Sequence, residues 1–219
     1  MELDLVAIRK DGYEVFENFD DDLFVIKQFA KKELCVSLVK KAHETMKEIP
    51  HRKENNGVFY SFDVLPSNTK TDRIFRTIIF EESKKNILET DFVNLFNLLS
   101  EFQNKYVLKT QTIEENKVRR LQLIHYPKGG GFFDWHSHPR FPVNYGLILN
   151  LSEKCVNLNE GATEIIRNNG DKICVEDFSD IGDLILFKFD LKHRVAPCNP
   201  KDDMVFDVNG RWTALMPIY

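Results

Sequence analysis

The feature that most constrains the fold is a series of short β-forming segments that fills the second half of the chain. They read RLQLIHY, YGLILNLS, ATEIIR, KICVE, DLILFKF and RWTALMPIY, and they lie between Arg120 and Tyr219. Gly, Asn, Asp and Pro separate them, and no stretch long enough for a helix intervenes. Several short strands without helices between them are typical of a sandwich, a barrel or a jelly roll. We therefore predict a mainly β core within an α+β chain.

The first half of the chain carries helical patterns instead. Residues 30–49 and 89–107 place apolar side chains at three- and four-residue spacing, which predicts two amphipathic helices, the first ending before Pro50. Residues 23–29 form a short apolar run and predict a strand. Between the helices, residues 51–76 are polar and rich in turn formers, which predicts a long loop that is either disordered or a functional lid.

The chain of 219 residues is long enough for one sizeable core, and neither a flexible linker nor an internal repeat divides it. We expect a single domain over residues 1–219. Residues 1–119 would form a helix-rich support and lid region, packed on the outside of a β core formed by residues 120–219.

Composition excludes several classes of function. The formal net charge of −4 argues against nucleic-acid binding, which usually needs a basic surface. No apolar stretch approaches the roughly 18 residues of a membrane span, and the first residues show no signal-peptide pattern, so we expect a cytoplasmic protein that does not use a membrane. The four cysteines form no CxxC pair and predict free, mostly buried thiols. They are Cys35, Cys155, Cys174 and Cys198.

The segment GGGFFDWHSHPR in the β half carries two histidines two residues apart. His136 and His138 would point to the same face of a strand, because side chains alternate along it. His193 follows GDLILFKFDLK near a predicted strand end and is the candidate for a third ligand. Two neighbouring ligands and one remote histidine, with coordination positions left open, is how non-haem iron oxygenase sites are built.

Arg211 opens the last predicted strand, and Thr213 shares its face. A single arginine on an inward strand face needs an anion as its partner, because a buried unpaired charge is very costly. A dicarboxylate cosubstrate would supply one, and the hydroxyl of Tyr126 would donate to the same carboxylate. The alternative for Arg211 is an internal salt bridge with an Asp or Glu.

Taken in order, these segments resemble the iron(II)- and 2-oxoglutarate-dependent dioxygenases, in particular the prolyl-hydroxylase-like branch. The resemblance runs from about Leu121 to Tyr219. IHYPKGGGFFDWHSH is similar to the family's tyrosine, glycine-rich turn and HxD segment, and YGLILNLSE and GATEII are similar to the strands that follow. GDLILFKFDLKHRVAPC is similar to the strand and run that carry the distal histidine, and GRWTALMPIY is similar to the arginine strand.

The resemblance implies a double-stranded β-helix, a cupin-like jelly roll, with the metal at one open end. It implies Fe(II) held by the three histidines and 2-oxoglutarate chelating that metal. The far carboxylate of 2-oxoglutarate would meet Arg211, with Tyr126 and Thr213 beside it. The implied reaction consumes dioxygen and 2-oxoglutarate, releases succinate and CO2, and hydroxylates or otherwise oxidises a substrate.

The departure from the family is His138, where the family has Asp or Glu. Three neutral imidazoles still suit Fe(II). Asp134 lies on the same alternation face and is the alternative ligand. Two further readings stay open, namely a cupin-like three-histidine metalloenzyme that does not use 2-oxoglutarate and a degenerate, non-catalytic binding module.

The residues that would contact the substrate are less constrained. Arg140 and Asn144 follow the HxH turn and are the candidate contacts, and the polar connection adds Tyr60 and Arg76. A solvated loop charge is the alternative for Arg140. We expect a small-molecule or amino-acid-like substrate.

Overall fold

The computed structural model of the chain describes residues 3–19, 23–47, 53–55, 58–64, 73–82, 90–108, 117–139 and 143–218. The strands are β1 Glu14–Phe19, β2 Leu23–Lys27, β3 Lys53–Asn55, β4 Val58–Val64, β5 Arg73–Glu81, β6 Arg120–Lys128, β7 Gly131–His136, β8 Tyr145–Asn150, β9 Thr163–Ile166, β10 Lys172–Cys174, β11 Leu184–Lys188, β12 His193–Cys198 and β13 Val205–Leu215. The helices are α1 Leu5–Lys10, α2 Lys32–Met46 and α3 Thr90–Phe102, which continues as a π-helical turn, Gln103–Leu108.

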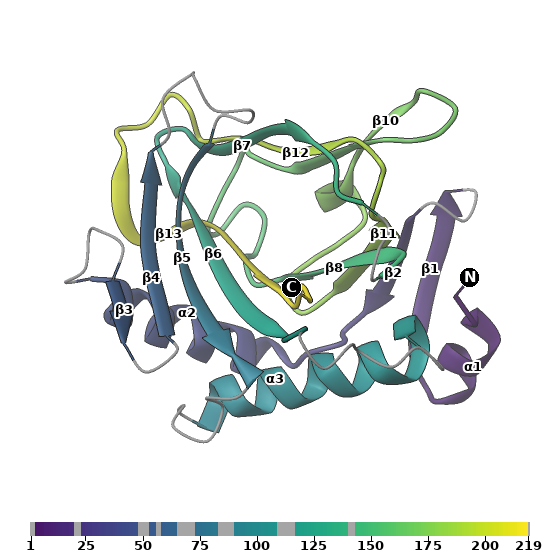
Figure 1. The fold of residues 1–219 in the computed structure, drawn as a ribbon. Coiled ribbons are helices and arrows are strands. Elements are labelled where there is room, and N and C mark those ends of the chain that lie inside the picture. Colours follow the sequence, from purple (N-terminus) through teal and green to yellow (C-terminus); the bar gives the residue numbers. More distant parts are fainter. Residues whose placement is uncertain are drawn as a thin grey trace.

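In the described residues these strands form one sheet with the order β1-β2-β11-β8-β13-β6-β5-β7-β12-β9-β10, while β3 and β4 extend it beside β5. β5 pairs along most of its length with β6, and its first residues, Arg73 and Ile74, pair with β7. The sheet therefore bends at β5 and rolls up. Figure 1 shows the result, with β7 and β12 lying across the interior from β6, β8 and β13.

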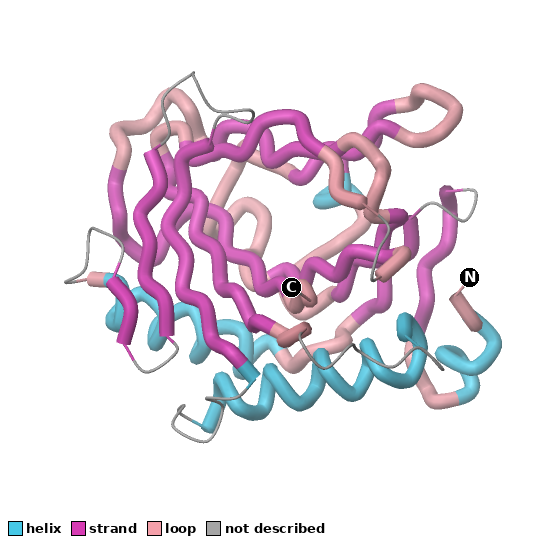
Figure 2. Tube along the Cα trace, viewed as in Figure 1, coloured by secondary structure: helices cyan, strands magenta, loops and turns pink. Residues whose placement is uncertain are grey.

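Helices α2 and α3 lie side by side against the outside of the rolled sheet (Figure 2). Their apolar stripes pack on one face of the central strands, in a core that includes Leu38, Leu95 and Leu99 of the helices. The helices predicted over residues 30–49 and 89–107 and the strand predicted over residues 23–29 are thereby confirmed, with shorter bounds.

Strand alternation divides the central strands between two environments. On β13, Trp212 and Ala214 join the helix-facing core, whereas Arg211, Thr213 and Leu215 line a cavity inside the barrel. The sequence predicted that Arg211 and Thr213 share a face, and they do. Because the cavity-facing row of β13 contains an arginine and a threonine, the barrel interior is partly polar.

The prediction that residues 51–76 form a loop or lid is wrong. β3, β4 and the start of β5 lie in this range, and β5 is a central strand between β6 and β7. The strands were hidden because Asn, Gly, Pro and Ser separate them and because β5 carries arginines on both of its faces. The helix-rich description of residues 1–119 therefore also needs correction, since this part contributes five strands, β1–β5, to the sheet.

All four cysteines are free thiols, as predicted, and Cys35 and Cys198 are buried while Cys155 is exposed. Within the described ranges, every helix is too short or too polar to span a lipid bilayer.

Candidate metal centre

Strand pairing brings the three predicted histidines together. His136 ends β7 and His193 begins β12, and the two are cross-strand partners. His138 lies two residues beyond β7, where its backbone N–H donates to the carbonyl oxygen of Phe189 at 3.0 Å. Its ring also packs on the Phe189 ring, with the centroids 4.6 Å apart. One candidate ligand nitrogen from each histidine lies within 4.8 Å of the other two.

The hydrogen bonds of two of these histidines fix which ring nitrogen is available. His136 Nδ1 lies 2.7 Å from the carbonyl oxygen of Asp134, and His193 Nδ1 lies 2.8 Å from that of Leu191. A carbonyl oxygen only accepts, so each Nδ1 carries the proton and donates it. The lone pair is then on Nε2 in both rings, which is how metal-binding histidines are usually oriented. The donor set therefore fits a metal ion.

Burial keeps the imidazoles neutral. It lowers the pKa of His136 to about 4 and that of His193 to about 3, and it also lowers the pKa of His138. Near pH 7 a proton therefore does not compete with a metal ion for these nitrogens. Three neutral nitrogen ligands suit Fe(II), Zn(II) and other divalent ions of the first transition row.

Asp134, the alternative ligand, takes a different role. In the described part of the chain, the group of side chains able to hold one ion consists of the three histidines and does not include Asp134. Asp134 contributes its backbone carbonyl, which orients His136. The geometry thus favours His138 over Asp134 as the third ligand.

The histidines open into a cavity of about 400 Å³ inside the barrel. Arg211, Thr213 and Tyr126, the predicted cosubstrate residues, line the same cavity. The rest of the lining is largely apolar and includes Phe75, Ile124, Phe133, Ile148, Phe187, Val195 and Leu215. A mostly apolar cavity with a few convergent polar groups is typical of a small-molecule site.

Tyr126 faces Arg211 directly across the β6–β13 pair. The Arg211 guanidinium carbon lies 5.7 Å from the centre of the Tyr126 ring. Burial raises the pKa of Tyr126 to about 12, so its hydroxyl stays protonated and can donate. Among the described residues this hydroxyl has no hydrogen-bond partner, which leaves it available to a ligand in the cavity.

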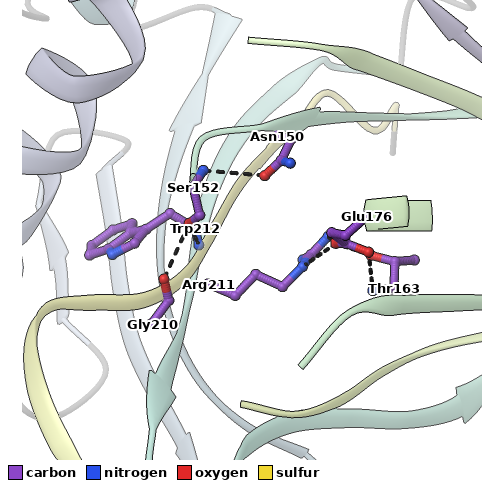
Figure 3. A network of polar contacts seen from close by, with 7 residues as sticks. All are labelled: Asn150, Ser152, Thr163, Glu176, Gly210, Arg211 and Trp212. Carbon is purple, nitrogen blue, oxygen red and sulfur yellow. Dashed lines mark hydrogen bonds and ion pairs between the residues drawn. The ribbon is translucent and has the colours of Figure 1, made fainter. Parts of the chain in front are cut away.

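Arg211 already has an anionic partner inside the protein (Figure 3). Its Nε donates to Glu176 Oε1 at 2.8 Å, and its Nη2 lies 2.7 Å from the same oxygen and also donates to the hydroxyl of Thr163. Both charged side chains are buried, with Arg211 1% exposed. The internal salt bridge, which the sequence left open as the alternative for Arg211, is therefore present.

Sequence reasoning missed Glu176, which lies in a short 3₁₀ turn, Val175–Asp177, directly after β10. The segment KICVE was read only as a strand. One signal could have found it. A buried arginine on an inward strand face needs a buried acidic partner, so an acidic residue among the apolar strands was a candidate partner for Arg211.

Arg73 was also missed. It lines the cavity, with its guanidinium carbon 5.3 Å from the centre of the Phe75 ring. Arg76, the residue proposed from the sequence, is on the opposite face of β5, where its Nε donates to His125 Nδ1 at 2.8 Å. Strand parity separates them, since Arg73 and Phe75 share one face and Arg76 lies on the other.

Of the other substrate candidates, Asn144 lies within the described residues and does not line the cavity. Asn144 accepts the backbone N–H of Phe189 through its carbonyl, and it is not among the cavity-lining residues although Val143 and Tyr145 are. Arg140 and the Tyr60 side chain lie outside the described part of the structure.

No protein-family model and no curated protein matches this sequence. Solved structures do match the fold. A prolyl-4-hydroxylase from Pseudomonas putida has a TM-score of 0.57 at 15% identity, over 89% of this chain and 90% of that one. A prolyl hydroxylase from Trichoplax adhaerens, solved with a hypoxia inducible factor peptide fragment, has a TM-score of 0.55 at 14% identity, over 89% and 82%.

A non-haem α-ketoglutarate-dependent epimerase from nogalamycin biosynthesis, SnoN, matches with a TM-score of 0.51 at 7% identity, over 90% of this chain and 77% of that one. At such identities the likeness concerns the fold. The chain has the double-stranded β-helix fold of these oxygenases, with helices packed outside, as the sequence predicted.

Proposed function

We propose that this chain is an Fe(II)-dependent oxygenase that uses 2-oxoglutarate as its cosubstrate. The observation that carries the proposal is the triad of His136, His138 and His193, in which two Nδ1 atoms are anchored to carbonyls and the Nε2 lone pairs are left for a metal. The likeness of the fold to iron- and 2-oxoglutarate-dependent oxygenases supports it.

Fe(II), when bound, would supply the activation of dioxygen that no side chain can provide. The three histidines would occupy three positions and leave the others for a chelating 2-oxo acid and dioxygen. The apolar lining around them would exclude water, and the Tyr126 hydroxyl would donate to the 2-oxo acid. The overall reaction would convert substrate, dioxygen and 2-oxoglutarate into hydroxylated or otherwise oxidised product, succinate and CO2.

For the substrate we propose a small molecule or an amino-acid-like compound. A cavity of about 400 Å³ suits a ligand of that size. Arg73, a cation in the lining, would attract an anionic group of the substrate. The Trichoplax protein was solved with a peptide fragment. If a peptide side chain entered the cavity of the present protein, this part of the proposal would be wrong.

A second function, a three-histidine metalloenzyme that does not use 2-oxoglutarate, is favoured by two observations. His138 takes the place of the usual carboxylate ligand, and the charge of Arg211 is already neutralised by Glu176. The first feature removes a negative charge from the metal ligands. The second removes the positive charge that would hold the far carboxylate of 2-oxoglutarate.

Anaerobic titration distinguishes the two functions. Fe(II) would be added to the metal-free protein, followed by saturating 2-oxoglutarate, while the visible spectrum is recorded. The proposal expects stoichiometric iron binding and a weak visible charge-transfer band from the chelate. Iron binding without a band would favour the second function, and absence of iron binding would refute the proposed oxygenase. A His136→Ala variant serves as the control that should give neither signal.

A further inference from the structure

Arg211 lines the cavity and is paired with Glu176, a buried anion that is not itself among the described lining residues (Figure 3). We propose that Glu176 determines the charge of the ligand that the cavity accepts. It occupies the guanidinium that would otherwise hold the far carboxylate of a 2-oxo diacid. The preferred ligand is then a 2-oxo acid that is anionic at its chelating end and uncharged at its far end. This inference rests on the proposed function and replaces 2-oxoglutarate, as the preferred cosubstrate, with a 2-oxo acid whose far end is uncharged.

Glu176 is held firmly in this position. Its Oε2 accepts the backbone N–H of Thr163 at 2.7 Å, while its Oε1 accepts from Arg211 Nε and from the Thr163 hydroxyl at 3.3 Å. These bonds hold both carboxylate oxygens of Glu176 in place. A ligand would have to break all of these bonds to take its place.

Arg211 is held just as firmly from its backbone. The Ser152 hydroxyl accepts the N–H of Trp212 at 2.6 Å and donates to the carbonyl of Gly210 at 3.2 Å, so it clamps the residues on both sides of Arg211. Gly210 has a φ of +113°, and a Cβ there would come within 2.4 Å of the Tyr126 carbonyl oxygen. The backbone on both sides of Arg211 is therefore fixed, and its side chain starts from a fixed position on β13.

The distribution of charge along the cavity leads to the same conclusion. At the metal end, three neutral imidazoles leave the full charge of a divalent ion to be balanced by the ligand, which favours an anionic chelating group. At the Arg211 end, a ligand carboxylate would lie close to the like charge of Glu176. The other cation in the described lining, Arg73, acts on His136 and Tyr126 through its charge.

The test compares two ligands that differ only in the far carboxylate, 2-oxoglutarate and 2-oxopentanoate, on the Fe(II)-loaded protein under anaerobic conditions. Dissociation constants would be measured by calorimetry and by the visible band. We expect the wild type to bind 2-oxopentanoate at least as tightly as 2-oxoglutarate. A wild-type preference for 2-oxoglutarate would overturn the proposal without any variant being needed.

The Glu176→Gln variant keeps an amide oxygen for the Thr163 N–H and removes the negative charge. We expect it to shift the preference at least tenfold toward 2-oxoglutarate, and a smaller shift would contradict the proposal. The matched control is Glu164→Gln. Glu164 follows Thr163 on β9, and its carboxylate pairs with Arg194 and Lys172 away from the cavity. Its ligand preference should equal that of the wild type.

A metal-free arm separates this inference from the proposed function. Glutarate, which has no 2-oxo group, should raise the melting temperature of Glu176→Gln and leave that of the wild type unchanged. Equal effects on both proteins would overturn the role of Glu176 even if neither protein bound iron. Loss of iron binding or of the visible band with both ligands would instead refute the proposed function alone.

Discussion

His136 and His193 occupy facing positions on β7 and β12, with their ring centroids 4.2 Å apart, and each donates its Nδ1 hydrogen to a carbonyl two residues earlier in the chain. The pairing of two strands thus sets both the separation and the tautomer of two candidate ligands. Because sheet pairing is more rigid than a loop, these two imidazoles are preorganised before any metal arrives.

The first prediction concerns these two ligands. His136→Ala and His193→Ala should each weaken Fe(II) binding by more than about 100-fold. Even mutation of a residue that only orients a metal ligand lowers metal affinity by about 10- to 100-fold. Asp134→Asn is the matched control, because the Asp134 carboxylate is outside the ligand group and its carbonyl is kept. Fe(II) affinity would be measured by competition with a chromogenic chelator. Loss of binding in Asp134→Asn would show that the carboxylate is a ligand after all.

The second prediction concerns His138, the position where the dioxygenases that the sequence resembles have Asp or Glu. His138→Asp should retain Fe(II) binding and tighten it, because a carboxylate adds a charge opposite to that of the ion. His138→Ala should weaken binding, since it removes a ligand and replaces it with nothing. The same chelator competition compares the three proteins. If His138→Ala left Fe(II) binding unchanged, His138 would not be a ligand in the wild type.

The metal centre could be predicted from the sequence because its geometry follows from local rules. The HxH spacing predicted two side chains pointing the same way, and in the structure His136 ends β7 while His138 lies two residues beyond it. A third histidine at the start of a nearby strand completes the group. The face shared by Arg211 and Thr213 follows from the same alternation. For these residues, the strand period alone was sufficient.

Glu176 and Arg73 could not be placed in this way. Glu176 meets Arg211 only because the turn after β10 packs against β13, a contact between residues 35 positions apart that no local pattern encodes. Arg73 and Arg76 have different roles because they lie on opposite faces of β5. Their faces can be assigned from the sequence only after β5 is recognised as a strand. That strand was missed because the turn formers before it dominate the pattern.

The third prediction follows from that parity. Arg76→Met should lower the free energy of unfolding by about 1–3 kcal/mol, because the His125 Nδ1 and the Asp207 carbonyl lose their buried donor. It should leave the affinity for ligands of the cavity unchanged. Arg73→Met is the matched variant on the opposite face, and it should weaken binding of anionic ligands. Urea unfolding and ligand titration of both variants provide the measurement, and a reversal of the two effects would contradict the assignment of faces.

The last prediction concerns the stability of the metal-free protein as a function of pH. Burial lowers the pKa of His136 to about 4 and of His193 to about 3, and it holds the pKa of His125 well below its usual value. In the unfolded chain these groups titrate near about 6.5, so below that pH the unfolded state binds more protons than the folded state. The contribution of these histidines to the free energy of unfolding should therefore be fully present above about pH 6.5, and it should be lost progressively as the pH drops toward 4.

The His136→Gln variant isolates the contribution of one imidazole. Between pH 6 and 5, where ordinary carboxylates remain ionised, each such histidine contributes a slope of about 1 kcal/mol per pH unit. Replacing His136 with a group that does not titrate should reduce the slope of the wild type by about that amount, while His193 and His125 continue to contribute. Urea unfolding of both metal-free proteins at several pH values measures it. Identical slopes would mean that His136 is protonated as readily in the folded protein as in the unfolded chain, and a neutral ligand set at pH 6 would then be ruled out.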